Sequence, residues 1–170
     1  MAFILAAERD GSGDACATAF ARYSEYLAAN RARFPSSAYE LATSEWYFDF
    51  ADQRCPHDAW LEAVEISEPS AGARNADRRT SIRVRLLSAA HDGHFEFYYP
   101  LAHSYELALT DGIEGHGDWR YDEFRLSEAG HVIHEIEWAG RADRGRWLIE
   151  ASDVLYSWRP FGADIGAPAT

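Results

Sequence analysis

The chain has 170 residues, a formal net charge of −12 at pH 7 and an aromatic content of 14%. This length is typical of one domain with a sizeable core, and the aromatic content favours a sheet-rich fold. The acidic balance argues against a surface that binds nucleic acid or an anionic membrane. It is compatible with a basic protein partner or with an acidic, solvated surface.

All sixteen basic residues are arginine. The absence of lysine excludes Schiff-base, pyridoxal-phosphate, P-loop and kinase chemistry, each of which needs a lysine. The two cysteines, Cys16 and Cys55, have no motif spacing, which predicts reduced thiols in a cytoplasmic protein. We expect no signal peptide, because no basic region precedes the apolar start of the chain, and no apolar run reaches the length of a membrane span.

An N-terminal helix is predicted over residues 15–33, after the helix-breaking segment 10–14. Its apolar residues recur at spacings of three, four and seven and form one stripe: Cys16, Phe20, Tyr23, Leu27 and Phe34. We expect this stripe to pack on the domain core, although the same periodicity could form the seam of a homodimer. A capping-box pattern at Ser37 and Glu40 predicts a short second helix that ends near Thr43.

Two further segments precede the first clear hairpin. Residues 46–50 alternate as a strand, with the even-numbered aromatic side chains on one face. Residues 60–67 are predicted to form the returning strand, although Pro56 also suits the first turn of a helix. Residues 68–78 are rich in Pro, Ser, Gly, Ala and Asn, which predicts a loop.

A hairpin is predicted from residues 80–88 and 94–99. Three apolar pairs share one of its faces: Ile82 with Tyr99, Val84 with Phe97, and Leu86 with Phe95. The other face places Arg85 opposite Glu96, so both faces agree on the register. A further strand is predicted over residues 103–109.

The C-terminal part contains four of the six tryptophans and is predicted to be a three-strand meander. Its strands are residues 119–126, 131–138 and 147–158. The polar, Gly-containing loop between the first two strands predicts a turn that pairs Leu126 with His131. The same register places Trp119 opposite Trp138, and across the next loop we expect Trp138 to pair with Trp147.

This register assigns ionisable residues to both faces of the meander. It places Glu123 beside His134 on the core face, where the carboxylate could orient a general base or satisfy a buried histidine. On the other face it places a row of three carboxylates, Asp122, Glu135 and Glu150. Like charges directly opposite one another destabilise a sheet. The row therefore needs a cation, a shared proton or a basic partner, or else the register is shifted by one residue.

Two other patterns contain residues that can bind metal ions. His91 and His94 flank the hairpin turn, which favours solvent exposure over metal binding. The acidic, Gly-rich loop 111–118 offers oxygen ligands for a hard cation, but it matches no calcium-binding pattern. Common nucleophile, dinucleotide and zinc-protease motifs are absent. The sequence therefore predicts no cofactor and no metal.

These elements predict a single α+β domain over residues 1–170, with residues 1–13 and 162–170 mobile. N-terminal helices would pack on a predominantly antiparallel, curled sheet of about six to eight strands, built from a hairpin and the C-terminal three-strand meander. Because the helices come first and the strands then follow one another, this order argues against a parallel α/β fold.

Nothing in the sequence specifies a reaction, and two functions are considered. The first is a non-enzymatic, cytoplasmic protein-binding domain, such as a bacterial inhibitor or immunity-type protein. It would present Asp122, Glu135 and Glu150 to a basic protein. The second is a small-ligand-binding or hydrolytic enzyme that uses Glu123 and His134 in the cup of the curled sheet. We favour the first.

Overall fold

The computed structural model describes residues 2–6, 13–69, 72, 74, 77–109, 115–140 and 144–162. Its helices are α1 (Gly13–Asn30) and α2 (Ser36–Ala42), joined by a 3-10 turn at Arg31–Arg33. Its strands are β1 (Trp60–Ser67), β2 (Ser81–Leu87), β3 (Gly93–Tyr99), β4 (Ala102–Leu107), β5 (Asp118–Leu126), β6 (Val132–Ala139), β7 (Arg144–Ala151) and β8 (Leu155–Pro160). None of the described helices is long and apolar enough to cross a membrane.

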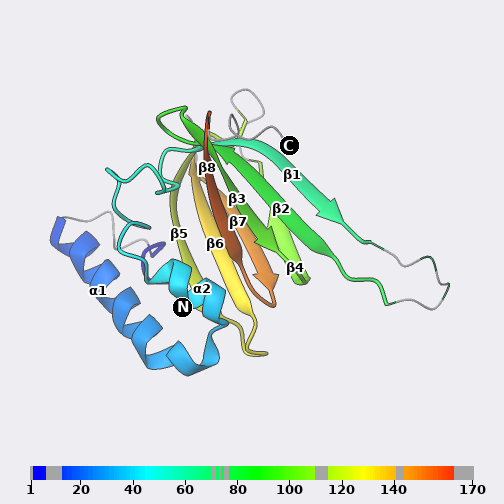
Figure 1. The fold of residues 1–170 in the computed structure, drawn as a ribbon. Helices are drawn as coiled ribbons and strands as arrows, with labels where there is room; N and C mark the ends of the chain where they lie inside the picture. Colours follow the sequence, from blue (N-terminus) through cyan, green and yellow to red (C-terminus); the bar gives the residue numbers. More distant parts are fainter. Residues whose placement is uncertain are drawn as a thin grey trace, which may run out of the picture.

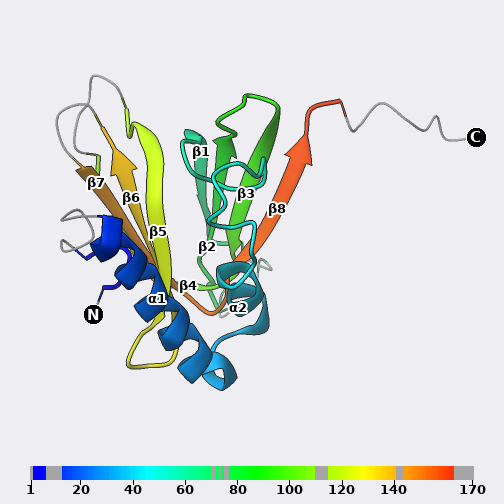
Figure 2. The same ribbon diagram turned by 90° about the vertical axis from the view of Figure 1, so that its left-hand side faces the viewer.

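The fold is α+β, as predicted, with N-terminal helices followed by one curled antiparallel sheet of eight strands (Figure 1). The strand order is β4-β7-β6-β5-β1-β2-β3-β8, and the sheet is not closed. In the described part of the chain, β5 and β1 pair only at Asp118 and Trp60. The sheet divides there into two halves, which Figure 2 shows facing each other with the helices along one side.

The core lies between these two halves. Phe97 of β3 stacks on Trp119 of β5 with ring centroids 5.1 Å apart, and Trp119 lies edge-on to Trp138 of β6. Helix α1 packs along β5, where the Tyr23 hydroxyl donates to the carbonyl oxygen of Phe124 and accepts from its N–H. β1 pairs with β5 at one residue pair only, so β1 does not hydrogen-bond to the rest of this edge of β5. The Tyr23 hydroxyl supplies hydrogen bonds to the N–H and C=O of Phe124 there.

Several local predictions are confirmed. The β2–β3 hairpin has the predicted register: Ile82 with Tyr99, Val84 with Phe97, Leu86 with Phe95, and Arg85 with Glu96. Residues 60–67 form a strand rather than a helix, and the second helix runs over Ser36–Ala42. In the predicted stripe of α1, Tyr23 and Leu27 are buried against the rest of the chain.

Residues 46–50 do not form the predicted strand. Consecutive turns occupy this segment: the N–H of Tyr47 donates to Ser44 O, and the N–H of Asp49 donates to Trp46 O. The segment lies between α2 and β1 in the chain, and none of the described strands pairs with it. As a result, Tyr47 is buried whereas Phe50 is exposed.

The predicted strand 147–158 is two strands. β7 pairs with β6 and β4, whereas β8 pairs with β3 at the opposite edge of the sheet. The connection contains Asp153, whose Oδ1 accepts the N–H groups of Val154 and of Ala38 in α2. It carries the chain from one half of the sheet to the other.

The turn between β5 and β6 shifts the predicted register by one residue. Ser127, rather than Leu126, bonds to His131, and Gly130 adopts a left-handed conformation with a φ of 85°. The loop therefore has three residues instead of four, a common hairpin geometry with glycine at that position. The side chains of β5 from Tyr121 to Leu126 consequently face the side opposite to the predicted one, whereas those of β6 keep their predicted faces.

A β-bulge next to Trp119 ends this shift. Trp119 pairs with Trp138 as predicted, whereas Tyr121, beyond the bulge, follows the shifted register. On β7, Trp147 pairs with Ile136 instead of Trp138. This second shift is of two residues, so it leaves every side chain on its predicted face.

The structure describes the two ends of the chain and the acidic loop only in part. The segments 1–13 and 162–170, expected to be mobile, and the acidic loop 111–118 fall in large part outside the described residues. At the N-terminus, the described residues include Phe3, Ile4 and Leu5, which are buried. The sequence did not indicate this contact.

Candidate functional site

Asp122 and His134 lie together on the core face, at 2% and 0% exposure. His134 Nε2 lies 2.9 Å from Asp122 Oδ2, and His134 Nδ1 lies 2.7 Å from the Tyr99 hydroxyl. Asp122 also accepts hydrogen bonds from the Tyr47 hydroxyl at 2.7 Å and from Trp119 Nε1 at 3.1 Å. Burial raises the pKa of both tyrosines well above the ordinary value, so both keep their hydroxyl protons. The network joins β3, β5, β6 and the turns after α2.

The predicted pairing of Glu123 with His134 is wrong. Glu123 lies on the opposite face of β5, where its Oε2 accepts the backbone N–H groups of Phe3 at 2.9 Å and Leu5 at 3.2 Å. Burial raises the pKa of Glu123, and the two N–H groups and the Arg125 guanidinium oppose this rise. The Glu123 carboxylate therefore anchors the N-terminal segment.

The predicted row of Asp122, Glu135 and Glu150 does not form. Asp122 faces the core, whereas Glu135 is buried on the other face of the sheet. Glu135 ion-pairs with Arg125 and with Arg146, whose Nη1 lies 2.6 Å from Glu135 Oε1. The Arg146 Nη2 also donates to a backbone oxygen of the N-terminal segment, so these charges hold that segment in place.

Glu150 belongs to a third, separate group of contacts. Its Oε1 lies 3.0 Å from His131 Nδ1, and its Oε2 accepts a hydrogen bond from Ser104. The hydroxyl of Ser127, followed by His131 and Ser104, lowers the pKa of Glu150. The five sequence-predicted site residues are thus distributed over three groups, each with contacts inside the fold.

An exposed group of side chains lies where the turns after α2 meet the start of β5. We call it the aromatic cluster, and its members are Phe50, His57, Asp58, Arg120 and Tyr121. Phe50 stacks on His57 with ring centroids 3.9 Å apart, and Tyr121 packs edge-on to His57 at 5.5 Å. The Arg120 guanidinium lies 5.3 Å from the Tyr121 ring centroid. Phe50 remains 52% exposed.

Polar contacts fix the histidine of the aromatic cluster. Asp58 Oδ1 lies 3.1 Å from His57 Nδ1, and Arg120 Nη1 lies 3.3 Å from His57 Nε2. Because arginine only donates, we assign Nε2 as the acceptor and place the ring hydrogen on Nδ1. Partial burial lowers the pKa of His57, although Asp58 opposes this change. His57 is therefore neutral near neutral pH.

Local backbone features position the aromatic cluster. The bulge after Trp119 turns Tyr121 to the outer face of β5. Asp58 has a φ of 60°, and its N–H donates to Trp119 O at 2.8 Å. Cys55 Sγ donates to the carbonyl oxygen of Tyr47, and burial raises the pKa of Cys55 to about 12. Cys55 is therefore a protonated, structural thiol.

Exposed aromatic surface continues from the aromatic cluster to the β2–β3 turn. Trp60 is 50% exposed and packs edge-on to His91 with centroids 4.5 Å apart. A hollow of about 150 Å³ lies between the cluster and this turn, with Phe50 and His57 on one side and Ala89 on the other. The surface therefore combines two exposed aromatic anchors with a concave region.

The aromatic cluster consists of two aromatic rings, a histidine, an arginine and an aspartate. The chain matches no protein-family model, no curated protein and no solved structure. Among the described residues, no group of three or more His, Cys, Asp or Glu side chains could hold a metal ion. Aromatic and arginine side chains are enriched in protein interfaces.

Sequence reasoning did not single out this cluster. It placed Phe50 on one face of a strand with Trp46 and Phe48, and it treated His57 as part of a loop. The available signal was the position of Phe50 between Asp49 and Asp52, which suits an exposed turn better than a strand packed on a core. The bulge that brings Arg120 and Tyr121 to the site leaves no such signal.

Proposed function

We propose that this protein is a non-enzymatic binding domain that recognises a basic protein, as an inhibitor or immunity-type protein does. We assign the aromatic cluster as its binding surface. The observation that carries this proposal is the half-exposed Phe50 ring, which stacks on His57, while Asp58 and Arg120 fix that histidine.

Exposed aromatic side chains provide the anchors. Phe50 and Trp60 are each about half exposed; Phe50 lines the hollow next to the β2–β3 turn, and Trp60 packs on His91 of that turn. Truncation of such residues at the centre of an interface commonly costs more than ~1 kcal/mol of binding energy. Because Phe50 is already stacked, little side-chain entropy is lost when a partner covers it.

The charges of the surface favour a basic partner. Asp49, Asp52 and Asp58 lie in or next to the cluster, facing Arg54 and Arg120, so carboxylates outnumber guanidinium groups. The whole chain carries a net charge of −12. A positively charged protein would be attracted to this surface over a distance of about one Debye length, roughly 8 Å at physiological ionic strength.

The contacts of the candidate acids and bases support a non-enzymatic role. Both ring nitrogens of His134 are bonded inside the core, and Glu123 holds backbone N–H groups. In the aromatic cluster, His57 Nε2 is occupied by Arg120. A general base must reach the proton that it removes, so these contacts favour recognition over catalysis.

We place this function in the cytoplasm. Cys16 and Cys55 are both free thiols, and reduced cysteines are typical of that compartment. The strongly acidic balance also favours a protein partner over nucleic acid.

Affinity capture from a lysate of the source organism, at low and at high salt, tests the proposal. Wild-type protein and Phe50→Ala are used in parallel, with Tyr105→Ala as the control because Tyr105 is 47% exposed on β4 at an edge of the sheet. We expect the wild type and the control to recover the same basic protein at low salt. High salt and Phe50→Ala should each abolish recovery.

Two results would argue against this function. Equal recovery of the basic protein by Phe50→Ala and the wild type would show that the aromatic cluster is not part of the interface. Recovery of nothing but the protein itself at both salt concentrations would contradict the proposal of a basic partner.

A further inference from the structure

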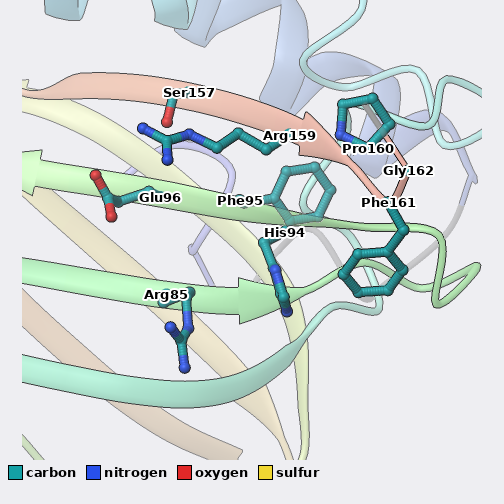
Figure 3. A pocket seen from close by; sticks show the side chains of 9 residues that line it. All are labelled: Arg85, His94, Phe95, Glu96, Ser157, Arg159, Pro160, Phe161 and Gly162. Carbon is teal, nitrogen blue, oxygen red and sulfur yellow. The ribbon is translucent and has the colours of Figure 1, made fainter. Parts of the chain in front are cut away.

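We propose a second site, a pocket on the outer face of β2, β3 and β8 that binds a small phosphate monoester. The pocket has a volume of about 280 Å³ and is shown in Figure 3. It shares no lining residue with the aromatic cluster, and the proposal does not depend on the function inferred above.

The register of three strands brings the polar side chains of this pocket together. Arg85 pairs with Glu96, which pairs with Ser157 on β8. His94 pairs with Arg159 in the next row of the same face. Figure 3 shows the Arg159 side chain extending along the outer face of β8 toward Ser157. The polar side chains of the pocket therefore lie on paired strands, and Phe161 and Gly162 in the turn after β8 complete its lining.

Two side chains of the pocket, Arg85 and His94, share one carboxylate. Glu62 Oε2 lies 3.1 Å from Arg85 Nε and 2.9 Å from His94 Nε2. Glu96, the acidic residue of the pocket, is ion-paired with Arg83, which reduces its repulsion of an anion. These ion pairs hold the side chains at the floor and edge of the pocket in defined positions.

Arg159 supplies the charge that these ion pairs do not neutralise. Within the described part of the chain, its guanidinium has no ion-pair partner and the Ser157 hydroxyl has no hydrogen-bond partner. The group formed by the pocket and its ion-pair partners contains three arginines, Arg83, Arg85 and Arg159, and two glutamates, Glu62 and Glu96. The formal net charge of this group of five side chains is thus +1, whereas that of the whole chain is −12.

The donors favour phosphate over a carboxylate. A guanidinium binds an oxyanion through two parallel N–H groups. One arginine can satisfy both oxygens of a carboxylate, whereas a phosphate group has a further acceptor for the Ser157 hydroxyl. Phe161 is 53% exposed and packs edge-on to His94 at 4.7 Å, so it offers an apolar wall for the ester group. The volume restricts the ligand to a small molecule.

An NMR titration of the full, ¹⁵N-labelled chain tests this site. The probes are phenyl phosphate, inorganic phosphate and acetate, each added at constant ionic strength. We expect saturable shifts at the backbone amides of Ser157, Arg159 and Phe161, with affinity decreasing from phenyl phosphate to phosphate to acetate. Arg159→Gln should weaken phenyl phosphate binding at least about tenfold.

Arg22→Gln is the matched control, because Arg22 is an exposed arginine on α1. It should change the affinity by less than about twofold, since long-range effects of one surface charge are small. Unchanged affinity of Arg159→Gln, or equal shifts around Arg22, would overturn the site. Acetate binding as tightly as phosphate would overturn the choice of phosphate. Inorganic phosphate binding more tightly than phenyl phosphate would overturn the choice of a monoester.

Discussion

The carboxylate of Asp122 and the imidazole of His134 lie 2.9 Å apart in the centre of the core, between the two halves of the sheet. Tyr47 and Trp119 complete the hydrogen bonds of Asp122, and Tyr99 completes those of His134. Buried polar groups are tolerated when each one has its partners, and such a network favours one packing arrangement over others. The network therefore links the sheet halves and the turns after α2.

Asp122→Ala should destabilise the protein by about 3–5 kcal/mol, because it leaves three buried donors without their acceptor. Urea unfolding measures the change, with Asp77→Ala as a control at an exposed position. The control should change the free energy of unfolding by less than about 0.5 kcal/mol. A loss below about 1 kcal/mol for Asp122→Ala would mean that the network does not hold the core.

Glu123 should make the stability of the protein depend on pH. Burial raises its pKa above the ordinary 4.5, so the folded protein retains a proton that the unfolded chain has released. The contribution of Glu123 is therefore largest below pH 4.5 and is lost as the pH rises through the folded pKa. Urea unfolding of the wild type and Glu123→Gln across this range should give a free-energy difference that falls with rising pH. A difference that rises instead would contradict the burial of this carboxylate.

Asp58 is expected to tolerate glycine but not a β-branched residue. Its φ of 60° lies in the left-handed region, which aspartate and glycine enter more readily than valine. Asp58→Val should lower the free energy of unfolding by about 1–2 kcal/mol more than Asp58→Gly. Thermal unfolding of the two variants measures this difference. Equal stabilities would show that Asp58 does not require the left-handed conformation.

The β2–β3 hairpin could be predicted residue by residue, because two independent patterns agreed. Its apolar pairs and the opposition of Arg85 and Glu96 gave the same register, and β3 contains no bulge. The position of the N-terminal helices and the open, curled, antiparallel sheet also followed from the order of the elements. Local alternation and element order are the features that a sequence expresses directly.

The site could not be predicted in the same way. The loop closed by Gly130 is one residue shorter than expected, and this difference moved Asp122 to the core and Glu123 away from it. The bulge next to Trp119 restores the predicted pairing of Trp119 with Trp138, so the correct pairing of these two tryptophans does not reveal the shift in the rest of β5. A shift of two residues on β7 kept Trp147 in the core, so periodicity alone could not detect it.

The exposed position of Phe50 depends on tertiary structure. The aromatic run at residues 46–50 alternates like a strand, but no strand in the described part of the chain pairs with it. Likewise, the predicted strand 147–158 divides because Asp153 binds α2 and the chain crosses to the other half of the sheet. The exposure of Phe50 and the division of strand 147–158 both depend on contacts with residues that are distant in the sequence, and local sequence patterns contain no information about such contacts.

The most direct test of the proposed function is the dissociation constant of the recovered basic partner for three proteins, the wild type, Phe50→Ala and Tyr105→Ala. The exposed Phe50–His57 stack should act as an anchor, so Phe50→Ala should weaken binding about tenfold or more, whereas Tyr105→Ala should stay within about twofold. If Phe50→Ala binds the partner as tightly as the wild type, the aromatic cluster is not the binding surface.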